Sequence, residues 1–206
     1  MCVAGTNYIL MASAIEFYLS SAFDLLDKKH PQVIINKQTG EPVSATQIEI
    51  NKVSQLAAFM ERVNANRTMA KTGMNSVSSR SHAALILTLH QYGRADLPNP
   101  EFANTYCKTS FTLMDLAGAE RVSKTGGKRV GGYQIFMDLA EARKKGKPAP
   151  IGAQGALINF ELTEMNTAVN KATMVWKQGS KYKIPKGMTT GSSVRSFFRP
   201  FSSRLD

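Results

Sequence analysis

Cysteine is scarce in this sequence. The 206 residues include only Cys2 and Cys107, with no CxxC pair and no cluster of histidine and cysteine at metal-binding spacing. This scarcity argues against both a disulfide framework and a structural zinc site. A reducing, intracellular environment fits the composition best.

Long hydrophobic runs are also missing. The longest uncharged stretch near the start, residues 1–15, falls short of the ~20 apolar residues that a membrane-spanning helix requires. It has no basic segment ahead of it and is followed by Glu16, which argues against a secretory signal peptide. Hydrophobic residues still make up 43% of the chain, so we expect a soluble protein with one domain of ordinary size.

Acidic residues are too few to balance the basic ones, and the net charge is +11. Basic and acidic side chains are equal in number up to Glu120, so the whole excess lies after that residue. One end of the molecule is therefore expected to attract a polyanion. A solvated, solubilising tail explains the same charge, and composition does not decide between the two.

The phosphate-binding pattern GxxxxGK[ST] is absent as well. The nearest candidate, Gly127-Lys128, is followed by Arg129 and lacks the upstream glycine. Without this loop, no cradle of backbone amides holds a β-phosphate and no lysine reaches it. The chain alone is therefore not expected to hydrolyse a nucleotide.

Hydrophobic patterns predict strands separated by loops in the first part of the chain. The run Tyr8–Leu19 is apolar throughout, as expected of a strand buried on both faces. A short helical turn is expected before Pro31, and two short strands around a turn at Gly40. The other predicted strands are Ala83–Leu89 and Thr109–Met114.

Helical spacing predicts an amphipathic helix over Lys52–Asn64, with Asn51 as its N-cap. Residues 121–156 contain many glycines and lysines, and we expect an irregular basic loop there. A second helix follows, of roughly twenty residues by its apolar spacing. Its predicted stripe consists of Ile158, Leu162, Met165, Val169, Ala172 and Trp176.

An aspartate and a glycine follow the strand predicted at Thr109–Met114. Asp115 could hold a water molecule on Mg²⁺, and the amide of Gly118 could approach a γ-phosphate because no Cβ blocks it. Taken alone, this DxxG pattern is more simply explained as a strand-ending turn with a capping aspartate.

A serine-rich segment, MNSVSSRSH, occupies residues 74–82. The hydroxyl groups of Ser78, Ser79 and Ser81 could ligate Mg²⁺ or bind phosphate oxygens, and Arg80 can form two hydrogen bonds to one carboxylate. By itself such a segment is usually a loop or a helix cap, and His82 is usually a satisfied histidine. Its pairing with DLAG is what indicates a phosphate-sensing site.

These motifs resemble those of a known family. NxxSSRSH at Asn75–His82 and DLAGxE at Asp115–Glu120 are similar, in order and separation, to the first and second switch motifs of kinesin motor domains. VNANRTMAKTGMNSVSSRSH resembles the family's GxxNRxxAxTxMNxxSSRSH, and INFELTEMNTAV resembles INxSLxxLxxVI, from the long helix that lies on the microtubule. The resemblance covers roughly residues 8–185.

The resemblance implies an α/β fold. This fold is a partial kinesin-type P-loop NTPase motor domain, with a central, mostly parallel β-sheet flanked by helices. The family's phosphate loop precedes the segment with which this chain begins, so the first strands and that loop are lacking. The implied domains are a partial motor domain at residues 1–185, with residues 121–156 as an extended basic loop, and a basic, flexible tail at residues 186–206.

The resemblance also implies roles for individual residues. Arg80 and Glu120 would form the catalytic ion pair that closes the two switches around ATP. Ser79 would reach Mg²⁺, and Asp115 would hold a metal-bound water. The residues expected to contact the nucleotide and its metal are Asn75, Ser78, Ser79, Ser81, Asp115 and Gly118.

Microtubules are the implied partner, and the cytoplasm and cytoskeleton the implied location. Basic residues before and within the long helix could meet the acidic tubulin surface. These residues are Lys124, Lys128, Arg129, Arg143, Lys144, Lys145, Lys147, Lys171 and Lys177. The family's later HxPYRxSKLT stretch is degraded here to KYKIPKGMTT, which places one filament contact in doubt.

Two functions remain open on the sequence. In the first, the chain is part of an ATP-dependent microtubule motor, and a longer polypeptide or a partner chain supplies the phosphate loop. In the second, it is a kinesin-like protein without hydrolysis that acts as a static module on microtubules or on another polyanion such as RNA. The chain has no RNA-binding aromatic signature, so nucleic acid is the less favoured partner, and no membrane is implied.

Overall fold

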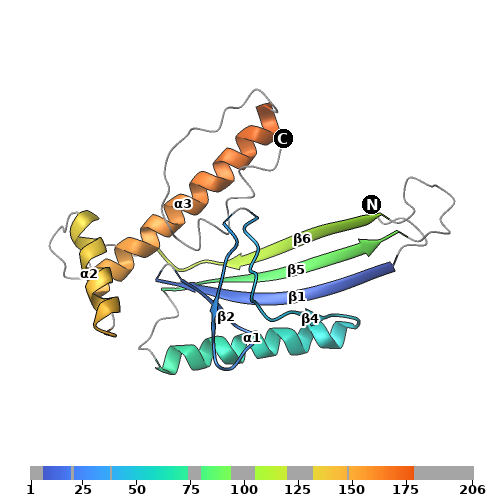
Figure 1. Ribbon diagram of the computed structural model, residues 1–206, viewed down its shortest axis with the longest axis horizontal. Helices are drawn as coiled ribbons and strands as arrows, with labels where there is room; N and C mark the ends of the chain where they lie inside the picture. The colour runs from blue at the N-terminus through green and yellow to red at the C-terminus, as the bar shows by residue number, and fades with distance from the viewer. Residues whose placement is uncertain are drawn as a thin grey trace.

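A single sheet forms the centre of the molecule (Figure 1). The computed structural model describes residues 7–19, 21–37, 39–73, 80–93, 105–119, 132–147 and 149–178. The strand order is β3-β2-β1-β5-β6, and β4 also pairs with β1. The strands are β1 (Asn7–Tyr18), β2 (Ser21–Asp24), β3 (Gln32–Val33), β4 (Ile48–Glu49), β5 (His82–Tyr92) and β6 (Tyr106–Asp115). The helices are α1 (Val53–Gly73), α2 (Gly132–Lys144) and α3 (Ile151–Gln178).

The described strands all pair in antiparallel fashion, so the expectation of a mostly parallel sheet is wrong for this part of the fold. The connections explain the difference. β5 leads directly into its neighbour β6, and a direct connection of this kind joins antiparallel strands. β4 and β5, which are joined through helix α1, run in the same direction, as in a crossover connection. They do not pair with each other, because β1 lies between them and is antiparallel to both.

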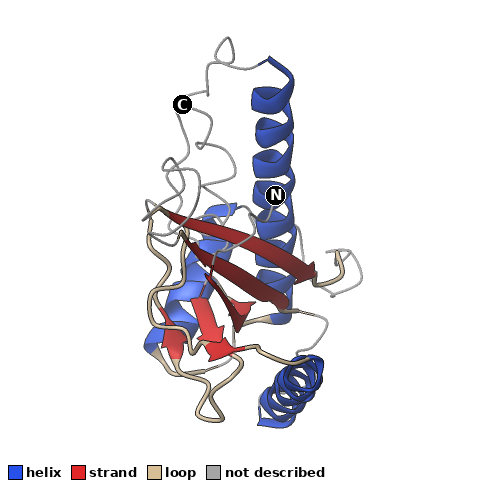
Figure 2. Cartoon of the chain, turned by 90° about the vertical axis from the view of Figure 1, so that its right-hand side faces the viewer, coloured by secondary structure: helices blue, strands red, loops and turns tan. Residues whose placement is uncertain are grey.

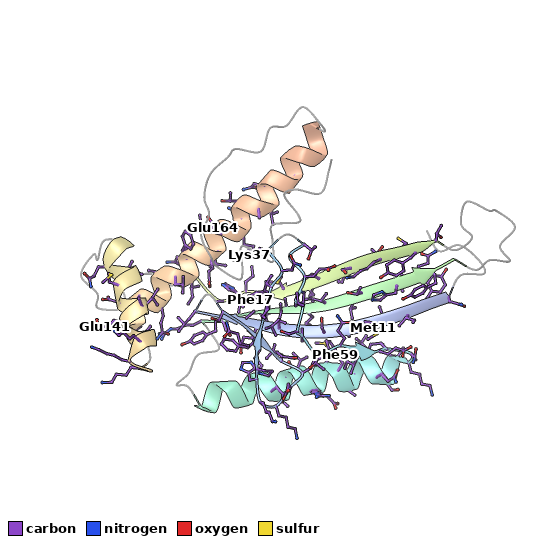
Figure 3. All side chains as sticks on the ribbon, in the orientation of Figure 1. Met11, Phe17, Lys37, Phe59, Glu141 and Glu164 are labelled. Carbon is purple, nitrogen blue, oxygen red and sulfur yellow. The ribbon has the colours of Figure 1, made fainter. Side chains whose placement is uncertain are left out.

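The sheet is covered on both faces at its centre, where successive side chains of β1 alternate between the faces. In β1, residues 12–17 are all buried, which confirms a strand covered on both sides over that part, whereas Tyr8 and Ile9 are exposed. One face packs Ala12, Ala14 and Ala83 against Phe59 of α1, which lies between that helix and the sheet (Figure 3). The other face carries a second core cluster around Ile15 and other residues, and α3 packs against it through Met165 and Ala168.

Helix α1 begins with a side-chain cap from its own first turn. The side-chain oxygen Oε1 of Gln55 accepts hydrogen bonds from the backbone amides of Asn51 and Lys52 at 2.6 and 2.9 Å. These bonds satisfy two amides near the helix start, as in a capping box. Because α1 begins at Val53, its N-cap position is Lys52, one residue after the predicted Asn51. The helix also continues nine residues beyond the predicted end, to Gly73.

The described part of the predicted basic loop, residues 132–147 and 149–156, is largely helical, which corrects that expectation. Helix α2 occupies residues 132–144 and α3 begins at Ile151. Gly146 has φ of 60°, and the Lys147 amide donates to the Ala142 carbonyl at 3.0 Å. This is the Schellman ending, in which a left-handed glycine terminates a helix. The glycine therefore marks the end of α2 and does not indicate general irregularity.

Helix α3 is long and extends well beyond the sheet (Figure 2). Its buried face includes Gln154, Leu157, Ile158 and Glu161. Of the predicted stripe, Ile158 is buried, whereas Val169 is 50% exposed. Leu162 and Met165 are half-buried, and the side chains of Ala172 and Trp176 lie outside the described part, so the stripe is confirmed only in part. No helix in the described ranges is long and apolar enough to cross a membrane.

Candidate functional site

The two motifs meet where β5 begins and β6 ends. Ala83 is paired with Asp115 in the register of these strands, so the end of NxxSSRSH lies beside the start of DLAG. Residues before Ala83 alternate between the faces of the sheet. Ser81 therefore lies on the α1 side, whereas Arg80 and His82 lie on the α3 side. The Ser81 hydroxyl contacts Glu16 on the α1 side, whereas Arg80 and His82 contact α3, and these contacts confirm the alternation.

On the α1 side, Glu16 of β1 is the centre of a polar cluster. Its carboxylate accepts a hydrogen bond from the Ser81 hydroxyl at 2.6 Å and lies 3.2 Å from His30 Nε2. Arg67 Nε of α1 lies 4.0 Å from the same carboxylate. Glu16 is only 6% exposed and Ser81 only 1%. The cluster thus fixes the last serine of NxxSSRSH from within the core.

His30 contributes to this cluster from an unusual backbone conformation. Its φ of 50° lies in the left-handed region, which side chains other than glycine seldom adopt. The ring stacks on Phe23, with centroids 5.3 Å apart. This stacking and the 3.2 Å contact hold the imidazole against Glu16.

The electrostatics of Glu16 follow from these contacts. Burial alone raises the pKa of a carboxyl group. Hydrogen bonds from His30 and Ser81, together with the positive charges of His30 and Arg67, outweigh burial and hold the pKa of Glu16 below its ordinary 4.5. The carboxylate is therefore ionised at neutral pH, and it can anchor both the serine and the arginine.

Arg67 also joins the cluster to the second motif. Its guanidinium forms an ion pair with Asp115 and reaches the Ser81 carbonyl oxygen at 3.5 Å. The Asp115 side chain is 69% exposed, so one carboxylate is both paired and open to solvent. A Cβ added at Gly118 would meet nothing within 4 Å. The space beside Gly118 is therefore open, and packing of the protein does not itself require glycine there.

On the α3 side, two polar contacts join the start of β5 to the helix. Arg80 donates to the Gln154 side-chain oxygen at 3.4 Å, and Gln154 in turn donates to the Ala149 carbonyl at 2.5 Å. His82 Nε2 lies 3.6 Å from Glu161 Oε2, and both residues are 2% exposed. Residues 154 and 161 are two helical turns apart on the same face. The helix thus touches the serine-rich segment at two points.

The structure brings together some of the predicted site residues and leaves others untested. Arg80, Ser81, Asp115 and Gly118 all lie at the junction of β5 and β6. The ion pair expected between Arg80 and Glu120 lies partly outside the described residues. Glu120 is the member of that pair that is not described, and Asn75, Ser78, Ser79, Lys124, Lys128 and Arg129 also lie outside the described residues.

Three lysines that are predicted to contact microtubules lie on the surface of the described part of the chain. Lys144, Lys145 and Lys147 are exposed at the end of α2 and in the turn after it. Lys145 forms an ion pair with Glu141 one turn earlier. Glu141 is labelled on α2 in Figure 3. Arg143, Lys171 and Lys177 belong to α2 and α3, but their side chains are not described.

Sequence reasoning missed the residues that hold this site together. Arg67 stood within the quoted stretch VNANRTMAKTG, and Glu16 was an acidic residue inside an apolar strand. These were the available signals. Glu161 replaces the serine of the family pattern within INFELTEMNTAV, whereas nothing marked His30. Within the described ranges, no group of three or more histidine, cysteine, aspartate or glutamate side chains could hold a metal ion.

Comparison with known proteins shows the family to which this chain belongs. The sequence model of the kinesin motor-domain family matches residues 4–135, and this range includes both motifs. The chain belongs to the kinesin motor-domain family. Kinesin-like protein KIN-UA from Oryza sativa subsp. japonica is 32% identical over 77% of this chain and 16% of its own length. The kinesin heavy chain of Neurospora crassa is 30% identical over 76% of this chain and 15% of its own length.

Solved kinesin structures share the fold. One described as kinesin 6 has a TM-score of 0.67 at 18% identity and covers 98% of this chain but 49% of its own. Another, titled as a fast kinesin, has a TM-score of 0.52 at 23% identity, with 77% and 46% of the two chains covered. The P-loop NTPase-type kinesin fold is thus present in part. This chain spans about half of these solved kinesins and a small fraction of the curated ones.

Proposed function

We propose that this chain is the nucleotide-sensing and microtubule-binding part of a kinesin motor. In this proposal the segments Asn75–His82 and Asp115–Glu120 respond to the γ-phosphate of ATP, and α3 lies on the microtubule. The protein would therefore act in the cytoplasm, on the cytoskeleton.

One observation carries the proposal. The last residues of one motif and the first residues of the other lie on paired strands. Asp115 pairs with Arg67 of α1 on one face of the sheet, and His82 contacts Glu161 of α3 on the other. The two segments are also joined by the hydrogen bond from the Ala117 amide to His82, so a change in one segment is passed to the other and to both helices. A switch requires this kind of link, in which a local change of charge, such as loss of the γ-phosphate, shifts a structural element between two conformations.

The residues present fit Mg²⁺ and ATP in part. The exposed Asp115 carboxylate suits a metal-bound water, and the open space beside Gly118 admits a phosphate oxygen. Arg67, which pairs with Asp115, would compete with a metal-bound water for the same carboxylate. Bound Mg²⁺ would neutralise phosphate charge. The cradle for the other phosphates has no counterpart in the sequence, so turnover requires a phosphate loop from outside this chain.

The edge of the sheet suggests where the missing half of the motor sits. In the described part of the sheet, β6 is the last strand in the order and pairs on one side only. Phe111 and Leu113 are 65% and 56% exposed there. An unpaired strand with exposed apolar side chains is a site for another strand to add. We therefore place the strands that accompany the phosphate loop against β6.

Two experiments test the function. The first is the mass of the native protein, by immunoblot with peptide mapping. A product much larger than 22.6 kDa, with a phosphate loop upstream, supports an ATP-driven motor. A product of 22.6 kDa without a partner chain would instead favour a static module, since no complete nucleotide site would exist.

The second experiment is co-sedimentation of the chain with microtubules, with RNA as a competitor. Binding that RNA does not displace supports the microtubule reading. Salt alone does not discriminate, because binding to either polyanion weakens with ionic strength. Absence of binding to microtubules would refute the proposal.

A further inference from the structure

The imidazole of His82 is held between the loop after β6 and helix α3. Its Nδ1 accepts a hydrogen bond from the Ala117 amide at 3.0 Å. A ring nitrogen that accepts a hydrogen bond carries no proton, so the proton of the neutral ring is on Nε2. That nitrogen faces Glu161 Oε2 at 3.6 Å. The geometry thus fixes the tautomer of His82 and the direction of both ring nitrogens.

Glu161 is an unexpected residue at this position. The family pattern INxSLxxLxxVI has serine where this chain has Glu161 within INFELTEMNTAV. The side chain is longer than serine and ionisable, yet it is 2% exposed. Within the described part of the chain, neither Glu161 Oε1 nor His82 Nε2 has a hydrogen-bond partner. Buried polar groups without full partners are costly and call for a functional explanation.

We propose that Glu161 is a positioning residue. It orients the ring of His82, and His82 in turn fixes the amide of Ala117, the residue before Gly118. A displacement of α3 is thereby passed to the loop that follows β6. The inference rests on the proposed function, in which α3 meets the microtubule and that loop senses phosphate.

The surroundings make this path stiff. His82 is the first residue of β5, and Phe17 of β1 faces it in the strand register. His82 is 2% exposed and Phe17 fully buried, so the ring has little room to rotate. A second contact, from Arg80 to Gln154, holds the same helix seven residues earlier. Movement of α3 along its axis therefore has to change the geometry at His82.

The path can be tested on the free 206-residue chain, apart from any filament. The readouts are the ¹⁵N shifts of the His82 ring and hydrogen exchange at the Ala117 amide. Glu161→Gln retains the shape and a carbonyl acceptor, whereas Glu161→Ser restores the family residue and removes the contact. Glu164→Gln, one turn further along α3 (labelled in Figure 3), is the matched control for loss of a carboxylate.

The unsubstituted chain is expected to show a neutral ring with the proton on Nε2. Glu161→Ser should mix the two tautomers and speed exchange at Ala117 by about tenfold, because exchange reports local opening. Glu161→Gln should shift the Nε2 signal, keep the tautomer and keep exchange slow. Glu164→Gln should change neither readout.

The proposal is overturned if exchange at Ala117 in Glu161→Ser stays within about twofold of the unsubstituted chain. If that variant does not fold, Glu161→Gln decides: an Nε2 signal unchanged from the unsubstituted chain would overturn the contact. Microtubule co-sedimentation of the unsubstituted chain is a separate test. Failure to bind, with the ring and exchange results as expected, would refute the proposed function and leave this path intact.

Discussion

Substitution of Glu16 tests whether the buried cluster anchors the serine-rich segment. Glu16→Ala removes the carboxylate that accepts from the Ser81 hydroxyl and lies beside the Arg67 guanidinium. The Arg67 side chain is only 15% exposed. Removing one partner of a buried charged pair costs about 3–5 kcal/mol. Glu16→Gln preserves the shape and one acceptor, so the loss of a charge-assisted hydrogen bond should cost about 1.5–3 kcal/mol.

Urea unfolding at neutral pH measures these losses as a lower midpoint with an unchanged slope. Glu49→Gln, on exposed β4, removes the same charge at the surface and should change stability by less than about 0.5 kcal/mol. A loss for Glu16→Gln no larger than that of this control would refute the anchoring role of the cluster.

Acid provides a second test of the same residue. The folded pKa of Glu16 is below 4.5 because hydrogen bonds and nearby positive charge outweigh burial, which alone would raise it. A lowered pKa stabilises the fold above the unfolded value of about 4.5, and this stabilisation is lost as the pH falls through the folded pKa. The stability gap between the unsubstituted chain and Glu16→Gln should therefore shrink below pH 4.5. A gap that stays constant down to acid unfolding would contradict this assignment.

The remaining predictions concern function. In a longer chain that contains a phosphate loop, Arg80→Ala or Glu120→Ala should abolish microtubule-stimulated ATPase and spare much of the filament binding; unchanged turnover in both variants would rule out the switch pair. Replacing Lys144, Lys145 and Lys147 by glutamate should weaken microtubule co-sedimentation roughly tenfold at moderate salt, since each exposed ion pair contributes up to about 1 kcal/mol. Equal sedimentation of the variant would assign these lysines to a solvated surface.

The strands were the most predictable part of the fold. The apolar runs at Tyr8–Leu19, Ala83–Leu89 and Thr109–Met114 correspond to β1, β5 and β6 within a few residues. The turn at Gly40 is also confirmed, with φ of 70° and a bridge between Ile35 and Pro42. These features depend on local hydrophobicity and backbone conformation, which sequence reports directly.

Strand direction and short polar strands were not predictable in the same way. The helical turn expected before Pro31 is preceded by β2, which pairs with the end of β1 over Ser21–Asp24. The side chain of Asp24 accepts hydrogen bonds from the amides of Leu26 and Thr46 at 2.7 and 2.6 Å, so it fixes this turn from a distance in sequence. Such long-range polar contacts decide pairing but leave no periodic signal.

The candidate site illustrates the same limit at the level of function. Its motifs were visible because they carry unusual residue types at fixed spacing. The residues that hold these motifs in place were not predictable in this way. The buried positions of α3 that contact the start of β5 include Gln154 and Glu161, and a search for an apolar stripe does not select polar residues. Burial of polar groups is costly unless they are paired, so these two residues weaken the helix as a packing element and make its position depend on Arg80 and His82. The feature that made α3 hard to predict from sequence is thus the one that ties the helix to the candidate site.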